Sequence, residues 1–187
     1  MNTLYLGLNP TPGTFHYPVI RTVYCANLEP ALALWPLFTH IIFTSQTAVH
    51  YWPGPWDKHL IAIGAATATA LKGKEVLIAP EATQEGIIAL IRNIDGYFFL
   101  PRSRLTRPTL TDFMTAQKIP HFALTLYDTI FQKLEPVPNL ADFDEIVFTS
   151  PSTVEGFLRI YGKLPNGIKL TPIGPITAGH LQSLSRH

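Results

Sequence analysis

The chain has 187 residues, of which 47% are hydrophobic and 14% charged, so it can bury one good core or two small ones. Fourteen Lys and Arg residues stand against thirteen Asp and Glu, and the net charge of +1 excludes broad electrostatic binding to nucleic acid. No apolar run approaches the roughly 20 residues that cross a bilayer, and the N-terminus lacks a signal-peptide pattern. We expect a cytoplasmic protein that binds neither nucleic acid nor membranes.

Short apolar strands alternate with helical segments along the chain, as in an α/β protein with parallel sheets. In chain order, strands are expected at 3–10, 18–25, 39–43, 75–80, 96–101, 121–131 and 145–148, with a further strand opening each of the segments 59–71 and 168–181. Helices are expected at 81–93 and 106–118 and directly after Ser45 and Ser150. The proline-containing segment 134–144 is interpreted as a link.

One phrase occurs twice, as IIFTSQTAVHYW at 41–52 and as IVFTSPSTVEGF at 146–157. In each copy an apolar strand meets Thr-Ser, and a second strand then leads to an Ile-Gly turn with a threonine three residues after the glycine. The copies lie too far apart for a solenoid repeat. They indicate a β-α-β-α unit that was built twice.

The serine in each copy follows a strand directly, where its hydroxyl can cap the first turn of a helix. A simple helix cap explains each serine taken alone about three times as readily as ligand binding does. The repetition of these serines in matched units favours a ligand-binding role at the carboxyl edge of the sheet. Ligands of open α/β sheets bind at the carboxyl ends of the strands, and the amides at helix starts attract anions. We expect Ser45, Thr67, Ser150 and Thr177 on such turns. The further substrate-binding candidates are Thr44, Gly64, Ser152 and Gly174.

The segment PRSRLTRP places Arg102, Arg104 and Arg107 beyond a buried strand and near a helix start. Anion capture, with Arg102 as the binding residue, is about as well supported as a solvated surface cluster. Tyr127 closes the extended segment FALTLY, where its phenol could reach a cleft and donate a proton. It is the catalytic candidate.

Other common chemistries lack support. Cys25 is the only cysteine and follows VY in a strand pattern, so neither a disulfide framework nor a reactive nucleophile is expected. The histidines show no metal-ligand spacing, and Asp142, Asp144 and Glu145 are interpreted as solvated. The motifs for dinucleotide binding, the phosphate loop, zinc hydrolysis and serine hydrolysis are all missing.

The ordered set of motifs resembles the uroporphyrinogen-III synthase family over about residues 37–181. IIFTSQTAV and IVFTSPSTV carry the resemblance, each followed by an IG-x-x-TA turn, together with PEATQEGI, FLPRSRLTRPTL and LYDT. The resemblance implies two flavodoxin-like parallel-sheet domains joined by two extended connectors, with the active site in the cleft between them. One domain is then built from both chain ends (1–24 and 132–187) and the other from 25–131. The end-built domain is reduced, because the helix expected between its first two strands is largely missing.

The resemblance also implies a reaction. The family closes hydroxymethylbilane, a linear tetrapyrrole with carboxylates on every ring, while inverting ring D to give uroporphyrinogen III for haem biosynthesis. It is a lyase reaction that needs neither metal nor organic cofactor, and we expect a monomer. By position, Tyr127 corresponds to the family's tyrosine thought to assist departure of the hydroxyl, and the serine and threonine turns correspond to its cleft lining.

Two alternatives stay open at the level of sequence. A non-catalytic protein of the same fold could bind anions or tetrapyrroles in the same turns. A nucleotide-dependent α/β enzyme is disfavoured, because no glycine-rich phosphate loop is present.

Overall fold

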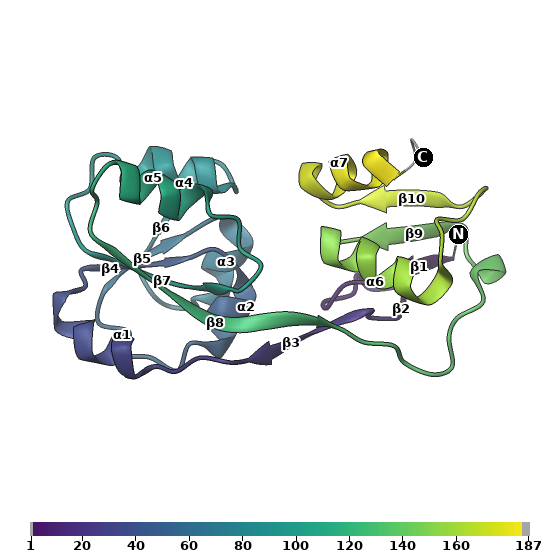
Figure 1. Cartoon of the computed structure of the whole chain (residues 1–187), viewed down its shortest axis with the longest axis horizontal. Coiled ribbons are helices and arrows are strands. Elements are labelled where there is room, and N and C mark those ends of the chain that lie inside the picture. The colour runs from purple at the N-terminus through teal and green to yellow at the C-terminus, as the bar shows by residue number, and fades with distance from the viewer. Residues whose placement is uncertain (1, 185–187) are drawn as a thin grey trace. The chain divides into compact units, whose positions relative to one another are not determined.

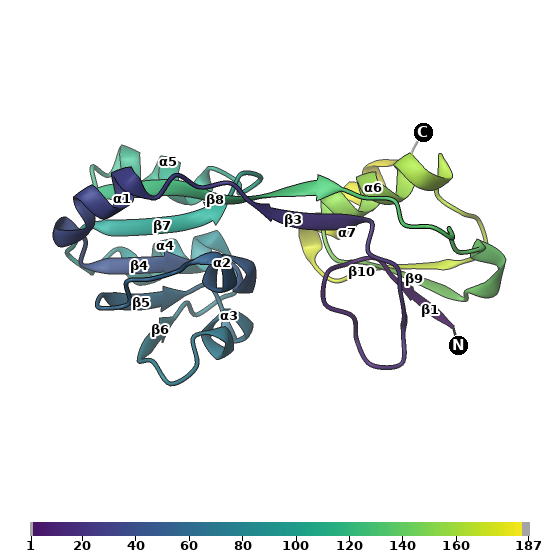
Figure 2. The ribbon, with the colours of Figure 1, turned by 90° about the horizontal axis from the view of Figure 1, so that it is seen from below.

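The structure is a computed structural model that describes residues 2–184. Contacts divide the chain into two compact units, which we call unit 1 (Met1–Thr22 with Thr129–His187) and unit 2 (Val23–Asp128). The chain enters unit 2 along β3 (Ile20–Tyr24) and leaves it along β8 (His121–Phe131), and Figure 2 shows these two strands running in opposite directions. The expected inserted domain, 25–131, has bounds two or three residues away from those of unit 2.

The sheet of unit 2 contains β4 (His40–Phe43), β5 (His59–Ala62), β6 (Val76–Ile78), β7 (Phe98–Ser103) and β8, with β3 as an edge strand. Its order is β3-β8-β7-β4-β5-β6, and all neighbours from β8 to β6 are parallel. The strand that comes first in sequence among the parallel five, β4, is therefore central, whereas flavodoxin itself has its third strand in the middle. The strand order reverses between β4 and β7, and their carboxyl ends flank a topological switch point.

Helices cover both faces of this sheet (Figure 1). On one face α1 (Glu29–Leu34), α2 (Gln46–Tyr51) and α3 (Ala65–Ala70) pack against Ile41, Phe43, Leu60, Ala62 and Phe99, with the 3₁₀ helix η1 (Trp35–Leu37) beside α1. On the other face α4 (Gln84–Ile91) and α5 (Thr109–Ala116) pack against Ile42, Ile61, Phe98 and Leu100. The strand residues that contact the two groups of helices alternate along each strand, because successive strand residues point to opposite faces. The predicted α/β class with parallel sheets is confirmed.

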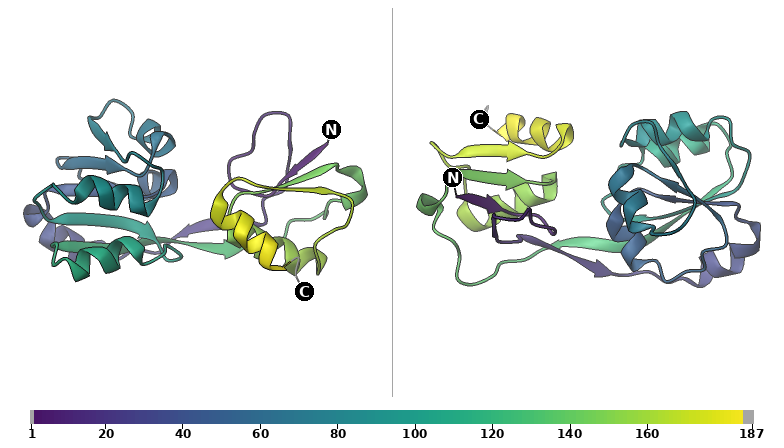
Figure 3. Two further views of the ribbon diagram at one scale, coloured as in Figure 1. Left: turned by 90° about the horizontal axis from the view of Figure 1, so that it is seen from above. Right: turned by 180° about the vertical axis from the view of Figure 1, so that it is seen from behind.

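Unit 1 has a four-stranded parallel sheet in the order β10-β9-β1-β2. Its strands are β1 (Thr3–Tyr5), β2 (Phe15–His16), β9 (Glu145–Phe148) and β10 (Lys169–Pro172). Two helices, α6 (Pro151–Tyr161) and α7 (Pro175–Leu184), pack side by side on the sheet face that carries Leu4, Leu6, Ile146 and Phe148 (Figure 3). The 3₁₀ helix η2 (Leu140–Asp142) lies in the predicted link.

The other face of the unit 1 sheet carries a buried carboxylate, and here the sequence-based prediction was wrong. Glu145 lies between Thr3 on β1 and Lys169 on β10, so the three side chains share one face. Its carboxylate accepts hydrogen bonds from Thr171 Oγ1 and from Thr3 Oγ1 (3.2 Å) and pairs with Lys169 Nζ at 2.8 Å. Lys169 first, and then the two hydroxyls, hold the pKa of the Glu145 carboxyl below its ordinary value. Glu145 is therefore a structural residue and not a solvated one.

Other differences from the sequence-based prediction concern element ends. The first strand ends at Tyr5, not at residue 10, and no helix lies between β1 and β3, as the reduced end-built domain requires. The two predicted helices at 81–93 and 106–118 are shorter at both ends, as α4 and α5. Cys25 lies after β3 and is exposed, so it is not part of the strand interior.

Candidate active site

The two copies of the repeated phrase fold alike. Ser45 caps α2 with φ −164° and ψ 154°, and Ser150 caps α6 with φ −162° and ψ 163°. The Ser45 hydroxyl oxygen accepts from the Ala48 amide at 3.0 Å, and that of Ser150 accepts from the Thr153 amide at 3.4 Å. Both predicted caps are confirmed. Thr44, Ser45, Ser150 and Ser152 are half-buried, at the point where β4 and β9 end.

The correspondence continues into the second strand of each copy. The Ile63 amide donates to the Phe43 carbonyl at 3.0 Å, and the Ile173 amide donates to the Phe148 carbonyl at 2.9 Å. Gly64 and Gly174 directly precede α3 and α7, and each carbonyl accepts a hydrogen bond of 3.0 Å from the amide four residues on. Each unit therefore presents two helix starts at the carboxyl ends of neighbouring parallel strands.

Thr67 and Thr177 do not lie on turns, which corrects the prediction. Each is the third residue of its helix, and only 4% of Thr67 and 3% of Thr177 are exposed. The helices begin directly after Gly64 and Gly174, and this start draws both threonines into the first helical turn. Their substrate-binding role stays a prediction.

A β-bulge directs Tyr127 towards α2. Arg102 on β7 pairs with Thr125 on β8, whereas the next residue, Ser103, pairs with Tyr127, so Leu126 is the extra residue. Without the bulge, Leu126 and Tyr127 would point to opposite faces. Both are instead buried in the core cluster that contains α2.

The bulge brings Tyr127 to the N-cap of α2. The Tyr127 phenolic oxygen lies 3.0 Å from the Ser45 hydroxyl oxygen, and either atom can be the donor. When Ser45 donates, the phenol proton of Tyr127 is available to a ligand, because a hydroxyl accepts and donates at once. Tyr51 of α2 packs on the Tyr127 ring at 5.6 Å between ring centroids and helps to hold the phenol in place. The arrangement can deliver a proton at the carboxyl edge of the sheet.

The three arginines at the end of β7 and in the loop after it have separate partners. Arg102 is half-buried within β7, and its Nη1 lies 3.5 Å from Thr111 Oγ1. Arg107 pairs with Glu85 at 3.4 Å. Arg104 pairs with Asp128 at 2.9 Å, and its backbone amide donates to the Tyr127 carbonyl at 2.9 Å. Arg104 is therefore joined through its backbone to Tyr127.

One position at the site was missed by the sequence reasoning. Aligning the two copies of the phrase pairs Thr47 with Ser152, and both are second residues of their helices, half-buried in α2 and α6. Ser152 was a substrate-binding candidate, so the repeat itself contained the signal for Thr47.

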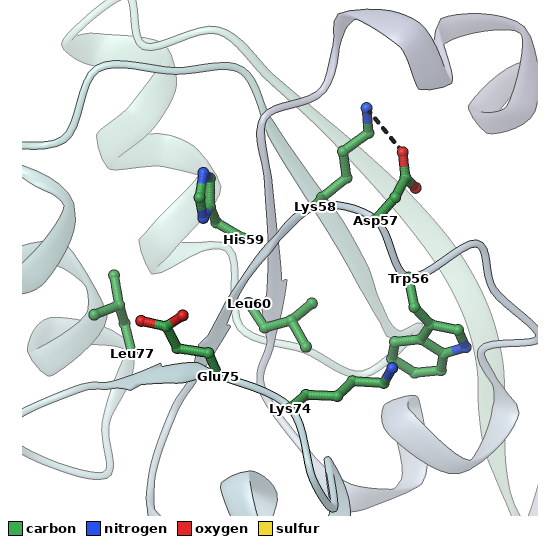
Figure 4. A pocket seen from close by; sticks show the side chains of 8 residues that line it. All are labelled: Trp56, Asp57, Lys58, His59, Leu60, Lys74, Glu75 and Leu77. Carbon is green, nitrogen blue, oxygen red and sulfur yellow. Dashed lines mark ion pairs between the residues drawn. The ribbon is translucent and has the colours of Figure 1, made fainter.

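A separate cavity of about 410 Å³ lies where β5 and β6 begin, at the end of the sheet opposite to Ser45 (Figure 4). Lys58 pairs there with Asp57 at 3.5 Å, and Lys74 lies 5.2 Å from the centre of the Trp56 ring. Within residues 2–184, no group of three His, Cys, Asp or Glu side chains is placed to hold a metal ion. We therefore take the Ser45–Tyr127 edge as the candidate site.

Comparison with known proteins identifies the family. The family model of uroporphyrinogen-III synthase HemD matches residues 13–185, which is most of the chain. The chain belongs to the uroporphyrinogen-III synthase family. The uroporphyrinogen-III synthase of Chlorobaculum parvum is 26% identical over an alignment of 177 residues, and the match covers 79% of this chain and 70% of that protein. The resemblance inferred from the sequence is confirmed.

Solved structures of uroporphyrinogen-III synthases share the fold. The Helicobacter pylori uroporphyrinogen-III synthetase matches with a TM-score of 0.73 at 18% identity, covering 98% of this chain and 89% of that one. A mutant uroporphyrinogen III synthase of Thermus thermophilus matches with a TM-score of 0.65 at 17% identity, with the same coverage of both chains. In the part of the chain that the structure describes, no helix is long and apolar enough to span a bilayer.

Proposed function

We propose that this chain is a uroporphyrinogen-III synthase, which closes hydroxymethylbilane with inversion of ring D to uroporphyrinogen III. Membership of the family supports the reaction. The observation that supports a site for it is the hydrogen bond between Ser45, at the carboxyl end of β4, and Tyr127, which pairs with Ser103 at the carboxyl end of β7. This position adjoins the topological switch point of the sheet, where ligands of open α/β folds bind.

The substrate carries many carboxylates, and in this proposal the repeated helix starts bind them. Backbone amides at the first turn of α2 and α6 supply donors and a partial positive charge, and the neighbouring hydroxyls add further donors. The binding residues are Thr44, Ser45, Gly64, Thr67, Arg102, Ser150, Ser152, Gly174 and Thr177. Their main task is to hold a flexible chain in the one conformation that leads to ring inversion.

Tyr127 carries the proton transfer. Its phenol gives a proton to the departing hydroxyl of the hydroxymethyl group, so the carbon–oxygen bond breaks and water leaves. The electron-rich pyrrole supplies the electron pair that compensates for this loss. A spiro intermediate then forms and fragments, and the pyrrole carbon that closes the macrocycle releases a proton that restores the phenol. The overall change is loss of one water, so the proposal requires no metal, redox cofactor or protein nucleophile.

In this proposal the protein is a cytoplasmic monomer that acts on a small polycarboxylate tetrapyrrole and not on nucleic acid. The net charge of +1 supports the last point, because nucleic-acid binding would need a basic surface.

The test supplies freshly made hydroxymethylbilane to the purified chain and separates the uroporphyrin isomers after oxidation. We expect isomer III to exceed isomer I, which forms without an enzyme. If only isomer I is found while the chain binds uroporphyrinogen III, the result contradicts the proposal and favours the non-catalytic binding protein.

A further inference from the structure

The backbone of Arg104 is fixed to Tyr127. Its amide donates to the Tyr127 carbonyl at 2.9 Å, in the turn that follows the carboxyl end of β7. The same turn is held by the Ser103 hydroxyl, which accepts from the Leu105 amide at 3.2 Å. The start of the Arg104 side chain is thus fixed beside the backbone of Tyr127.

The guanidinium of Arg104 is held in place but keeps donors to spare. Its Nε contacts the Asp128 carboxylate at 2.9 Å, and one terminal amine lies 3.9 Å from the sulfur of Cys25. The other terminal amine, Nη1, has no hydrogen-bond partner among residues 2–184. The side chain is 60% exposed, so a ligand can reach it. A guanidinium that one carboxylate holds by Nε can bind a second carboxylate through its terminal amines.

The two neighbouring arginines are less suited to this task. Arg102 is half-buried, and its Nη1 is directed to Thr111. Arg107 is exposed and pairs with Glu85 through Nη1, which is one of the two amines that a ligand would use.

We propose that the Arg104 guanidinium binds a carboxylate of the substrate next to Tyr127 and so determines which carboxylated ring lies at the proton donor. This inference rests on the proposed function, since it requires a polycarboxylate ligand at this edge of the sheet. Asp128 orients the guanidinium, and the ligand carboxylate occupies the exposed terminal amines. Arg104 thus positions the substrate, whereas Tyr127 acts on the leaving group.

The experiment compares Arg104→Gln, Arg104→Lys and Arg107→Gln with the unmodified chain in initial-rate assays of isomer III formation. Arg107→Gln is the matched control, since it removes the same charge from the same loop. Loss of one charge-assisted hydrogen bond predicts a KM about tenfold higher for Arg104→Gln, with a turnover number within about twofold. The Lys variant keeps the charge but not the planar guanidinium, so its KM should lie between those of the unmodified chain and Arg104→Gln. The control should keep KM within about twofold.

The dependence of KM on ionic strength is a second measurement, and it would not change if Arg104 had only a structural role. Raising the salt concentration from about 0.01 M to about 0.15 M shortens the screening length from about 30 Å to about 8 Å. KM should therefore rise more steeply with salt for the unmodified chain than for Arg104→Gln. All variants should unfold at nearly the same temperature, because an exposed ion pair contributes little to stability.

Several results would overturn the assignment. An unchanged KM in Arg104→Gln would do so, as would an equal rise in Arg107→Gln, which would reflect net charge alone. A fall in turnover number with an unchanged KM would place Arg104 in the chemistry and not in binding. If the unmodified chain makes no isomer III, the proposed function fails. Titration with uroporphyrinogen III then decides the role of Arg104, and equal affinities of the unmodified chain and Arg104→Gln would refute it.

Discussion

The hydroxyl oxygen of Ser45 lies 3.0 Å from the phenolic oxygen of Tyr127, although the two residues are 82 positions apart in the sequence. Ser45 follows β4, and Tyr127 lies on β8, two strands away in the sheet. The side chain spans this distance because the bulge at Leu126 turns Tyr127 towards the face that α2 covers. This contact joins a helix cap to a potential proton donor.

Replacing Tyr127 by Phe should lower the turnover number by about 100-fold, the low end for loss of a general acid. The ring stays in the core, so the free energy of unfolding should fall by only about 1 kcal/mol, the contribution of one hydrogen bond. Single-turnover rates of isomer III formation and the dissociation constant of uroporphyrinogen III are to be measured together. Equal losses in rate and in product affinity would reassign Tyr127 to binding.

The two capping serines should separate stability from catalysis. Ser45→Ala and Ser150→Ala each remove an N-cap and should each destabilise the fold by about 1 kcal/mol in urea titrations. Only Ser45 contacts Tyr127, so only Ser45→Ala should lower the turnover number, whereas Ser150→Ala should raise KM. Equal falls in turnover number for both variants would show that the Ser45–Tyr127 contact has no special role.

Gly7, two residues after β1, allows the backbone to lie close to Thr149. A Cβ at Gly7 would lie 2.4 Å from Thr149 Cγ2 and 2.6 Å from its hydroxyl oxygen, so Gly7→Ala should destabilise the fold by about 1–3 kcal/mol. The cost should shrink in a Thr149→Ala background, where two of the clashing atoms are gone. Gly179→Ala is the control, because a Cβ there meets no atom within 4 Å and alanine favours the helix. Additive effects of the Gly7 and Thr149 changes would contradict the proposed clash.

Glu145 should make the free energy of unfolding depend on pH. Its folded-state pKa lies below the ordinary value of 4.5, because Lys169 and two hydroxyls stabilise the carboxylate. This contribution is fully present above the unfolded-state pKa and is lost as the pH falls through the folded-state pKa. Glu145→Gln should therefore be less stable than the unmodified chain at pH 7, and the difference should narrow below about pH 4. Urea titrations between pH 7 and pH 3 measure it, and a difference that is constant with pH would exclude the ionised carboxylate as its cause.

The parts of the site that depend on neighbouring residues were predictable from the sequence. A serine directly after an apolar strand predicts an N-cap, because the hydroxyl and the amide it binds are three residues apart. Both caps, at Ser45 and at Ser150, have that local geometry. The Ile-Gly turns were found for the same reason, but the helix starts after them were misplaced by a few residues, and this left Thr67 and Thr177 on the wrong side of the boundary.

Long-range pairing decided the rest. The α/β class, the duplicated unit and the family motifs followed from the sequence alone, since each depends on local pattern and order along the chain. The bulge that directs Tyr127 to Ser45, the burial of Glu145 beside Lys169 and the attachment of Arg104 to Tyr127 came only from the tertiary structure. A strand's register is set by its partner across the sheet, and shifting it by one residue moves a side chain to the other face, so residues far apart in sequence meet only once the sheet is assembled.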